Sequence, residues 1–239
     1  MFSPFCMRSM AFARTLLKPL VDRLIKISVS GIENIPRRGP FVLVSNHRSD
    51  LDPVIIASVV PRYIAWVADA FLFNIPLVGT VLHQLGAIPI SGRRREQLHA
   101  FRRSREILGA GQPVGIFPEG HDSIVRGARM KLGRFHSGFA ELALQGHVPV
   151  LPVTVIPLEE DARQIQIPDF VKAWLHLPQD VAATRQRIVY SRVHVEIGRR
   201  IETSPYAGGL CGKARKTGLF ELVSRTRIAI GKTLYRAAG

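Results

Sequence analysis

Residues 41–53 of this 239-residue chain read Phe-Val-Leu-Val-Ser-Asn-His-Arg-Ser-Asp-Leu-Asp-Pro. The apolar run at the start predicts a buried strand, and the final proline suits the first turn of a helix. Between them, His47 and Asp52 stand five positions apart. An imidazole can act as a general base that a neighbouring carboxylate orients and stabilises when protonated. Ser49 and Asp52 also match a helix capping box, so the segment fits either a catalytic pair or a plain helix start.

Short β-rich runs alternate with longer helical ones on both sides of this segment. The expected strands lie at 26–29, 41–45, 63–67, 87–90, 114–117, 150–156 and 187–197, and the expected helices at 53–60, 71–84, 94–108 and 134–144. The alternation predicts an α/β fold, a single domain with a central mixed, largely parallel sheet flanked by helices. The chain length and a hydrophobic fraction of 46% agree with one sizeable core.

Basic amphipathic helices are expected at both ends of the chain. Apolar residues from 13 to 27 recur at helical spacing with basic residues beside them, and 213–236 shows a similar pattern. Such helices can lie on a membrane surface or pack on the domain, and the N-terminal one can also be an organelle-targeting segment. We therefore divide the chain into a membrane-association segment at 1–25, a central domain at 26–203 and a C-terminal basic helix at 204–239.

The composition narrows the possible functions. A net charge of +15 and a pI near 11.0 favour polyanionic partners, either an anionic membrane or a nucleic acid. No apolar run is long enough for a clean transmembrane helix. The two cysteines and eight histidines show no metal-binding spacing, so no metal is expected. The G-x-S-x-G elbow of serine hydrolases does not occur.

Four segments stand in an order and spacing that resemble the glycerolipid acyltransferase family, which includes 1-acylglycerol-3-phosphate acyltransferases. The four segments are Asn46-His47-Arg48-Ser49-Asp50-Leu51-Asp52, Gly86-Ala87-Ile88-Pro89-Ile90-Ser91-Gly92-Arg93, Ile116-Phe117-Pro118-Glu119-Gly120 and Val148-Pro149-Val150-Leu151-Pro152-Val153. They match the family's N-H-x4-D, G-x-[IF]-x-[IV]-x-R, F-P-E-G and V-P-[VI]-x-P-V blocks. The resemblance covers about residues 26–200, and the ordered set of four is far more specific than any one block.

The resemblance implies an O-acyltransferase in which His47 deprotonates the acceptor hydroxyl and Asp52 orients the ring. The hydroxyl would attack an acyl thioester directly, without a covalent acyl-enzyme. Backbone N–H groups at the start of the helix after His47 are candidate donors to the oxyanion. The implied substrate-binding residues are Asn46, Ser49, Arg93, Arg94, Glu119, Gly120 and His121.

Two departures from the family pattern concern the acceptor. In the second block Gly92 stands where the family usually has arginine, and the basic residue follows at Arg93. In the third block His121 and Asp122 replace the usual Thr-Arg, which puts a carboxylate where a phosphate is expected. Lysophosphatidic acid is therefore the default acceptor, and a lyso-aminolipid or another acceptor without glycerol phosphate is the alternative.

The resemblance also sets the expected partners. These are a lysolipid acceptor, an acyl-coenzyme A or acyl-carrier-protein thioester as donor, and an anionic membrane surface, with no bound cofactor. The expected location is the cytoplasmic face of a membrane, peripherally associated. Two rivals remain: a basic nucleic-acid-binding protein, supported by charge alone, and a lipid-binding relative without activity. Nucleic acid is not expected as a partner, because the basic stretch 93–105 lacks the interleaved aromatic residues of single-strand binders.

Overall fold

The structure is a computed structural model that describes residues 18–19, 21–120, 132–165, 185–206 and 212–236. Its strands are β1 Lys26–Ser30, β2 Val42–Ser45, β3 Ala65–Asp69, β4 Ile88–Ile90, β5 Val114–Ile116, β6 Val150–Ile165 and β7 Arg185–Ile197. Its helices are α2 Asp52–Val59, α3 Val78–Gln84, α4 Arg94–Gly109, α6 Gly138–Gly146 and α9 Gly212–Arg236. Short 3-10 turns are η1 Ile32–Asn34, η2 Ala70–Asn74 and η3 Ser204–Tyr206.

The strands form one sheet in the order β1-β7-β6-β2-β5-β3-β4. Among the described strands every neighbouring pair is parallel except β6 and β7, which form an antiparallel hairpin. The predicted α/β fold with a mixed, largely parallel sheet is therefore confirmed. Because β2, β5 and β3 are parallel neighbours, the residues that follow them meet at one edge of the sheet.

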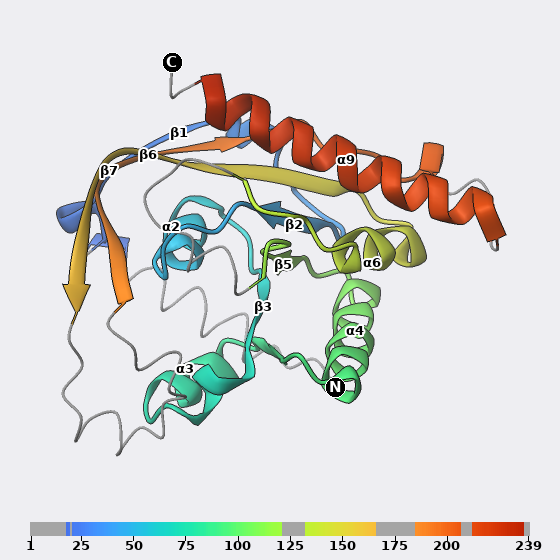
Figure 1. Cartoon of the computed structure of the whole chain (residues 1–239), viewed down its shortest axis with the longest axis horizontal. Coiled ribbons are helices and arrows are strands. Elements are labelled where there is room, and N and C mark those ends of the chain that lie inside the picture. The colour runs from blue at the N-terminus through green and yellow to red at the C-terminus, as the bar shows by residue number, and fades with distance from the viewer. Residues whose placement is uncertain (1–17, 20, 121–131, 166–184, 207–211, 237–239) are drawn as a thin grey trace.

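Each face of the sheet has its own apolar core, because alternate residues of a strand point to opposite faces. Phe41 and Leu43 pack with α2 on one face. Val42 and Val44 pack with α4, α6 and α9 on the other. Figure 1 shows α9 lying along the sheet, with α6 between α9 and α4. The predicted helix at 213–236 is thus present and covers one of the two cores.

The predicted helix at 71–84 is wrong as a single element. It divides into η2 and α3, with Leu77 between them at a φ of 66°. Pro76 explains the break, because proline disfavours helical geometry at the residue before it and lacks an N–H for the helix. The predicted helix at 134–144 begins only at Gly138, and β6 and β7 extend further into the hairpin than predicted.

Most of the predicted N-terminal segment, 1–25, lies outside the described residues. Its described part includes an ion pair between Lys18 and Asp22, 2.6 Å apart and one helical turn from each other. No helix in the described part of the chain is both long and apolar enough to cross a bilayer.

Candidate active site

The imidazole of His47 and the carboxylate of Asp52 lie side by side at the end of β2. The Nδ1 atom of His47 is 3.0 Å from Oδ2 of Asp52. Asp52 is the first residue of α2 and is fully buried, whereas the His47 side chain is 15% exposed. A carboxylate only accepts hydrogen bonds, so Nδ1 carries the proton and Nε2 presents its lone pair. Nε2 has no hydrogen-bond partner among the described residues, which leaves it available as a base.

Three further donors surround the Asp52 carboxylate. The backbone N–H groups of Arg48 and Ser49 donate to Oδ2 over 2.7 and 2.8 Å. The hydroxyl of Tyr190 on β7 donates to Oδ1 over 2.9 Å. Burial, and then the charge of Asp52, raise the pKa of Tyr190 far above its usual value of 10, so the phenol keeps its proton. Four donors thus hold a buried carboxylate, which satisfies its charge and fixes its position.

The sequence did not identify Tyr190 as a site residue. It lies 138 residues from Asp52, and the apolar alternation of its strand predicts only that its side chain is buried, not which group it contacts. The capping-box interpretation is half right. The Ser49 N–H donates to Asp52, as a capping box requires, but the Ser49 hydroxyl donates instead to the carbonyl of Ile188 at 2.6 Å. The Asp52 carboxylate therefore serves both the helix start and the histidine.

A stack of three rings holds the face of the imidazole. The His47 ring lies 4.1 Å from that of Phe117, which in turn lies 4.9 Å from Trp66 at nearly parallel orientation. Gly115 makes room for the indole, since a Cβ there would lie 2.5 Å from a Trp66 ring atom. The stack joins β2, β5 and β3, so it fixes the imidazole plane against the sheet.

The backbone N–H groups of residues 47–49, which precede α2, are all engaged. The N–H groups of Arg48 and Ser49 bind Asp52, and the N–H of His47 donates to Oε1 of Glu119 at 3.2 Å. These three N–H groups hold the loop around His47 in place. The expected role of backbone N–H groups at the start of α2 as oxyanion donors stays a prediction.

Glu119 fastens two segments of backbone together. Besides His47, it accepts a hydrogen bond from the Gly133 N–H at 2.5 Å, and its side chain is almost fully buried. Burial raises the pKa of its carboxyl above the usual value, and the two backbone donors oppose that rise. Gly120 turns the chain at a φ of 65°, a conformation that favours glycine. Glu119 thus joins the backbone at His47 to that at Gly133. Contact of Glu119 and Gly120 with substrate stays a prediction.

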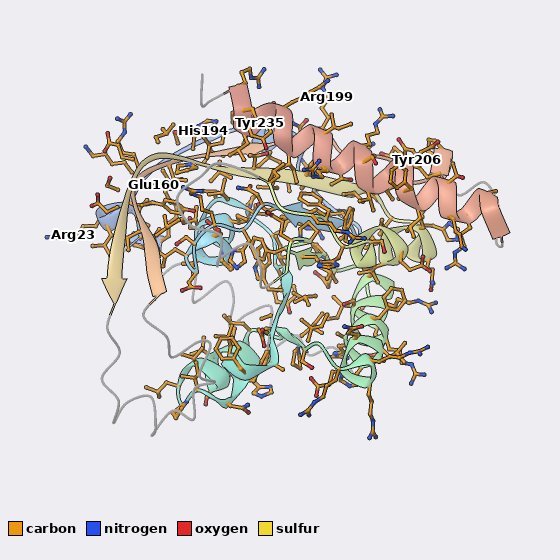
Figure 2. The ribbon with its side chains drawn as sticks, in the orientation of Figure 1. Arg23, Glu160, His194, Arg199, Tyr206 and Tyr235 are labelled. Carbon is orange, nitrogen blue, oxygen red and sulfur yellow. The ribbon has the colours of Figure 1, made fainter. Side chains whose placement is uncertain are left out.

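Asn46 and Ser49 also anchor the loop to distant strands. The Asn46 side-chain amide donates to the carbonyl of Val155 and accepts from its N–H, both at 2.9 Å. Arg48 binds Glu160 of β6 through both carboxylate oxygens, with Nε 2.7 Å from Oε2. Figure 2 places Glu160 at the bend of the β6–β7 hairpin. The hairpin therefore holds the residues around His47, and a substrate contact of Asn46 or Ser49 stays a prediction.

The remaining predicted site residues lie elsewhere or outside the described chain. Arg93 and Arg94 are exposed at the start of α4, and the Arg93 side chain, 85% exposed, lies 3.6 Å from Glu96. Neither shares a hydrogen bond or ion pair with the His47–Asp52 pair in the described part of the chain. His121 and Asp122 lie outside the described residues. Within the described ranges no group of three potential metal ligands comes together.

Comparison with known proteins identifies the family. The model of the Acyltransferase family matches residues 26–156, more than half of the chain. The chain belongs to this family. The match includes the His47–Asp52 pair, Phe117 and Glu119, but ends before Tyr190.

The relatives described below are 27–33% identical to this chain over the matched regions. A chloroplastic 1-acyl-sn-glycerol-3-phosphate acyltransferase of Brassica napus is 32% identical over 55% of this chain and 37% of its own length. A 1-acyl-sn-glycerol-3-phosphate acyltransferase of Borreliella burgdorferi is 33% identical over 55% of this chain and 51% of its own. An uncharacterized protein of Mycobacterium tuberculosis is 27% identical over 95% of this chain and 65% of its own. The chain thus spans about a third to two thirds of these relatives.

The crystal structure of a 1-acyl-sn-glycerophosphate acyltransferase from Thermotoga maritima has the same fold. It superposes with a TM-score of 0.63 at 22% identity and covers 98% of this chain and 84% of its own. The similarity therefore includes the β6–β7 hairpin and α9, which lie beyond the segment matched by the family model.

Proposed function

We propose that this protein is an O-acyltransferase that transfers a fatty acyl group from an acyl thioester to a lysolipid hydroxyl. The observation that carries the proposal is the buried His47–Asp52 pair, whose free Nε2 faces away from the carboxylate at the ligand-binding edge of the sheet. The thioester is acyl-coenzyme A or acyl-carrier protein. Two named relatives act on 1-acyl-sn-glycerol-3-phosphate, which makes this lipid the favoured acceptor and phosphatidic acid the product.

In the proposed reaction, Nε2 of His47 takes the proton of the acceptor hydroxyl as its oxygen attacks the thioester carbonyl carbon. The tetrahedral intermediate then collapses, the C–S bond breaks, and the leaving thiolate takes up the proton from Nε2 of His47, which returns the imidazole to its neutral form. The products are an ester and a free thiol. Asp52 keeps Nδ1 protonated and balances the charge of the imidazolium formed. A protein that acts on such a lipid would work at a membrane surface, here the cytoplasmic face.

The acceptor has a second candidate, a lysolipid without a glycerol phosphate, such as a lyso-aminolipid. It is favoured by Arg93, whose side chain is 85% exposed and pairs with Glu96, with no hydrogen bond or ion pair to the His47–Asp52 pair among the described residues. A phosphate bound beside His47 would therefore need its positive charge from residues other than Arg93 in this arrangement.

The test is an acyl-transfer assay with His47→Ala and wild type across a panel of lysolipids, with both donor types. General-base catalysis contributes about 10²–10⁴-fold, so His47→Ala should lose at least that much turnover while circular dichroism stays unchanged. His99→Ala, which removes an exposed histidine of α4, is the matched control and should retain activity. Near-normal turnover of His47→Ala would refute the catalytic assignment. Salt-dependent binding to DNA or RNA that ignores His47 would favour the nucleic-acid rival.

A further inference from the structure

An apolar segment of the molecule belongs to neither core. Residues 70–85, which we call the apolar platform, comprise η2, the turn at Pro76 and α3. Its only buried residue is Gly79, although the platform contains nine large apolar side chains. Leu77 is 81% exposed, the most of any large apolar residue in the described chain, and Val78 and Val81 are 42% and 50% exposed. Exposed apolar side chains gathered on one element indicate a surface that something else covers.

The platform is a built structure rather than a loose loop. Gly79 packs α3 directly on η2, because a Cβ at this position would lie 2.1 Å from the carbonyl oxygen of Phe73. The rings of Phe73 and His83 also meet, with centroids 5.0 Å apart. Leu77 is held at a positive φ of 66°, which is rare for leucine, and points into solvent. These contacts present Leu77, Val78 and Val81 on a defined scaffold.

Positive charge borders the platform, and negative charge is missing from it. No acidic residue occurs between Asp69 and Glu96, and Arg93, Arg94 and Arg95 are all exposed. Strands β3 and β4 pair so that Asp69 lies opposite Ile90, which brings the start of the platform and the three arginines to one edge of the sheet. Figure 1 shows α3 and the first turn of α4 on the same side of the molecule, with α9 on the opposite side.

The platform also begins at the edge that carries the His47–Asp52 pair. It follows β3 directly, and β3 is parallel to β5, which is parallel to β2. The ring stack of His47, Phe117 and Trp66 crosses these same three strands. A surface in contact with the platform would therefore lie near the edge at which a lipid would reach His47.

We propose that the platform and Arg93–Arg95 form the surface through which this protein contacts an anionic phospholipid bilayer. Apolar side chains enter the bilayer interface and the arginines bind lipid phosphates, a combination that strengthens binding to anionic membranes. An acidic protein would match the arginines but not the uncharged apolar surface beside them. The proposal rests on the proposed function in one respect: an enzyme that acylates a lysolipid must reach the membrane that contains it.

The experiment compares vesicle binding of the full-length chain and its variants by co-sedimentation, without substrate. The vesicles contain phosphatidylcholine with or without phosphatidylglycerol. Leu77→Asn/Val81→Asn should weaken binding to the anionic vesicles by at least about tenfold, because two apolar side chains no longer leave water. The triple variant Arg93→Gln/Arg94→Gln/Arg95→Gln should also lose at least about tenfold, and should lose the preference for phosphatidylglycerol.

The matched control is Phe220→Asn/Ile228→Asn on α9, which changes two side chains that are 72% and 53% exposed on the opposite side of the molecule. This variant should bind like the wild type. Equal binding by the platform variant, or an equal loss in the α9 control, would overturn the proposal. So would platform-dependent self-association without vesicle binding, which would mark the surface as a protein interface. The platform variant should acylate a dispersed short-chain acceptor at the wild-type rate. Failure of the membrane proposal is therefore distinguishable from failure of the catalytic role of His47.

Discussion

At the residue scale, the site depends on how Asp52 is held rather than on the histidine and carboxylate alone. A buried carboxylate is costly unless hydrogen bonds satisfy it, and here His47, two backbone N–H groups and Tyr190 share that role. Three of these donors come from the loop itself. The fourth comes from β7, so the orientation of the base depends on a strand far away in the sequence.

We expect Tyr190→Phe to lower kcat by about tenfold or more without unfolding the protein. Phenylalanine keeps the ring in the core but leaves Oδ1 of Asp52 without its donor, and a hydrogen bond to a charged group contributes about 1.5–3 kcal/mol. Steady-state kinetics over a range of pH measures the loss of kcat, and thermal unfolding checks that the fold is retained.

The alkaline side of the pH–rate profile provides a further check. Burial raises the pKa of Tyr190 well above 10, so the wild-type hydroxyl remains a donor as the pH rises. The ratio of wild-type to Tyr190→Phe rates should therefore not shrink at alkaline pH. The control is Tyr206→Phe, which removes a hydroxyl that accepts from Arg225 at 2.9 Å on the α9 side of the protein. A Tyr190→Phe variant with wild-type kcat across the pH range would show that the phenol only fills space.

At the scale of elements, the β6–β7 hairpin acts as a clamp on the loop around His47. Besides the two hydrogen bonds between Asn46 and Val155, it contacts the loop through the Tyr190 hydroxyl, the carbonyl of Ile188 and the carboxylate of Glu160. The last three lie beyond residue 156, where the family match ends. The hairpin thus completes a site whose reactive residues come from the matched segment.

Glu160→Gln should lower both the melting temperature and kcat, because it leaves the guanidinium of Arg48, whose side chain is only 11% exposed, without its carboxylate. The neighbouring pair of Glu159 and Arg192 provides the control, since it spans the same hairpin at 2.8 Å but is about half exposed on both sides. Glu159→Gln should leave both quantities unchanged, because exposed ion pairs contribute little. Thermal unfolding and steady-state assays on the two variants measure the difference, and equal behaviour would argue against the clamp.

The order of the elements could be predicted from sequence better than their contacts. Strand positions followed from apolar runs bounded by turns, and the motifs identified the His47–Asp52 pair. The division of 71–84 was missed because the apolar periodicity continues through Pro76. The clamp was missed because Glu160 and Tyr190 meet their partners only through sheet pairing over more than a hundred residues, which local patterns do not encode.

At the scale of the whole molecule, α9 belongs to the same folding unit as the site. Leu222, Ile230 and Leu234 lie in one buried cluster with Val42 and residues of α4 and α6. The sequence separates 204–239 as a C-terminal helix that packs on the domain or on a membrane. Its buried side packs on the domain, so its loss would expose one of the two cores.

The same substitution at two isoleucines of α9 tests whether α9 and the sheet unfold together. Ile230 is fully buried and Ile228 is 53% exposed. Ile230→Ala should reduce the free energy of unfolding by about 2–5 kcal/mol, because it removes packed methyl groups and leaves a cavity. Ile228→Ala should change it by less than about 0.5 kcal/mol, as expected for an exposed position. Denaturant unfolding should show one transition that shifts as a whole in Ile230→Ala, since α9 and the sheet share a core. A separate transition that alone responds to Ile230→Ala would instead show that α9 folds apart from the domain that carries His47.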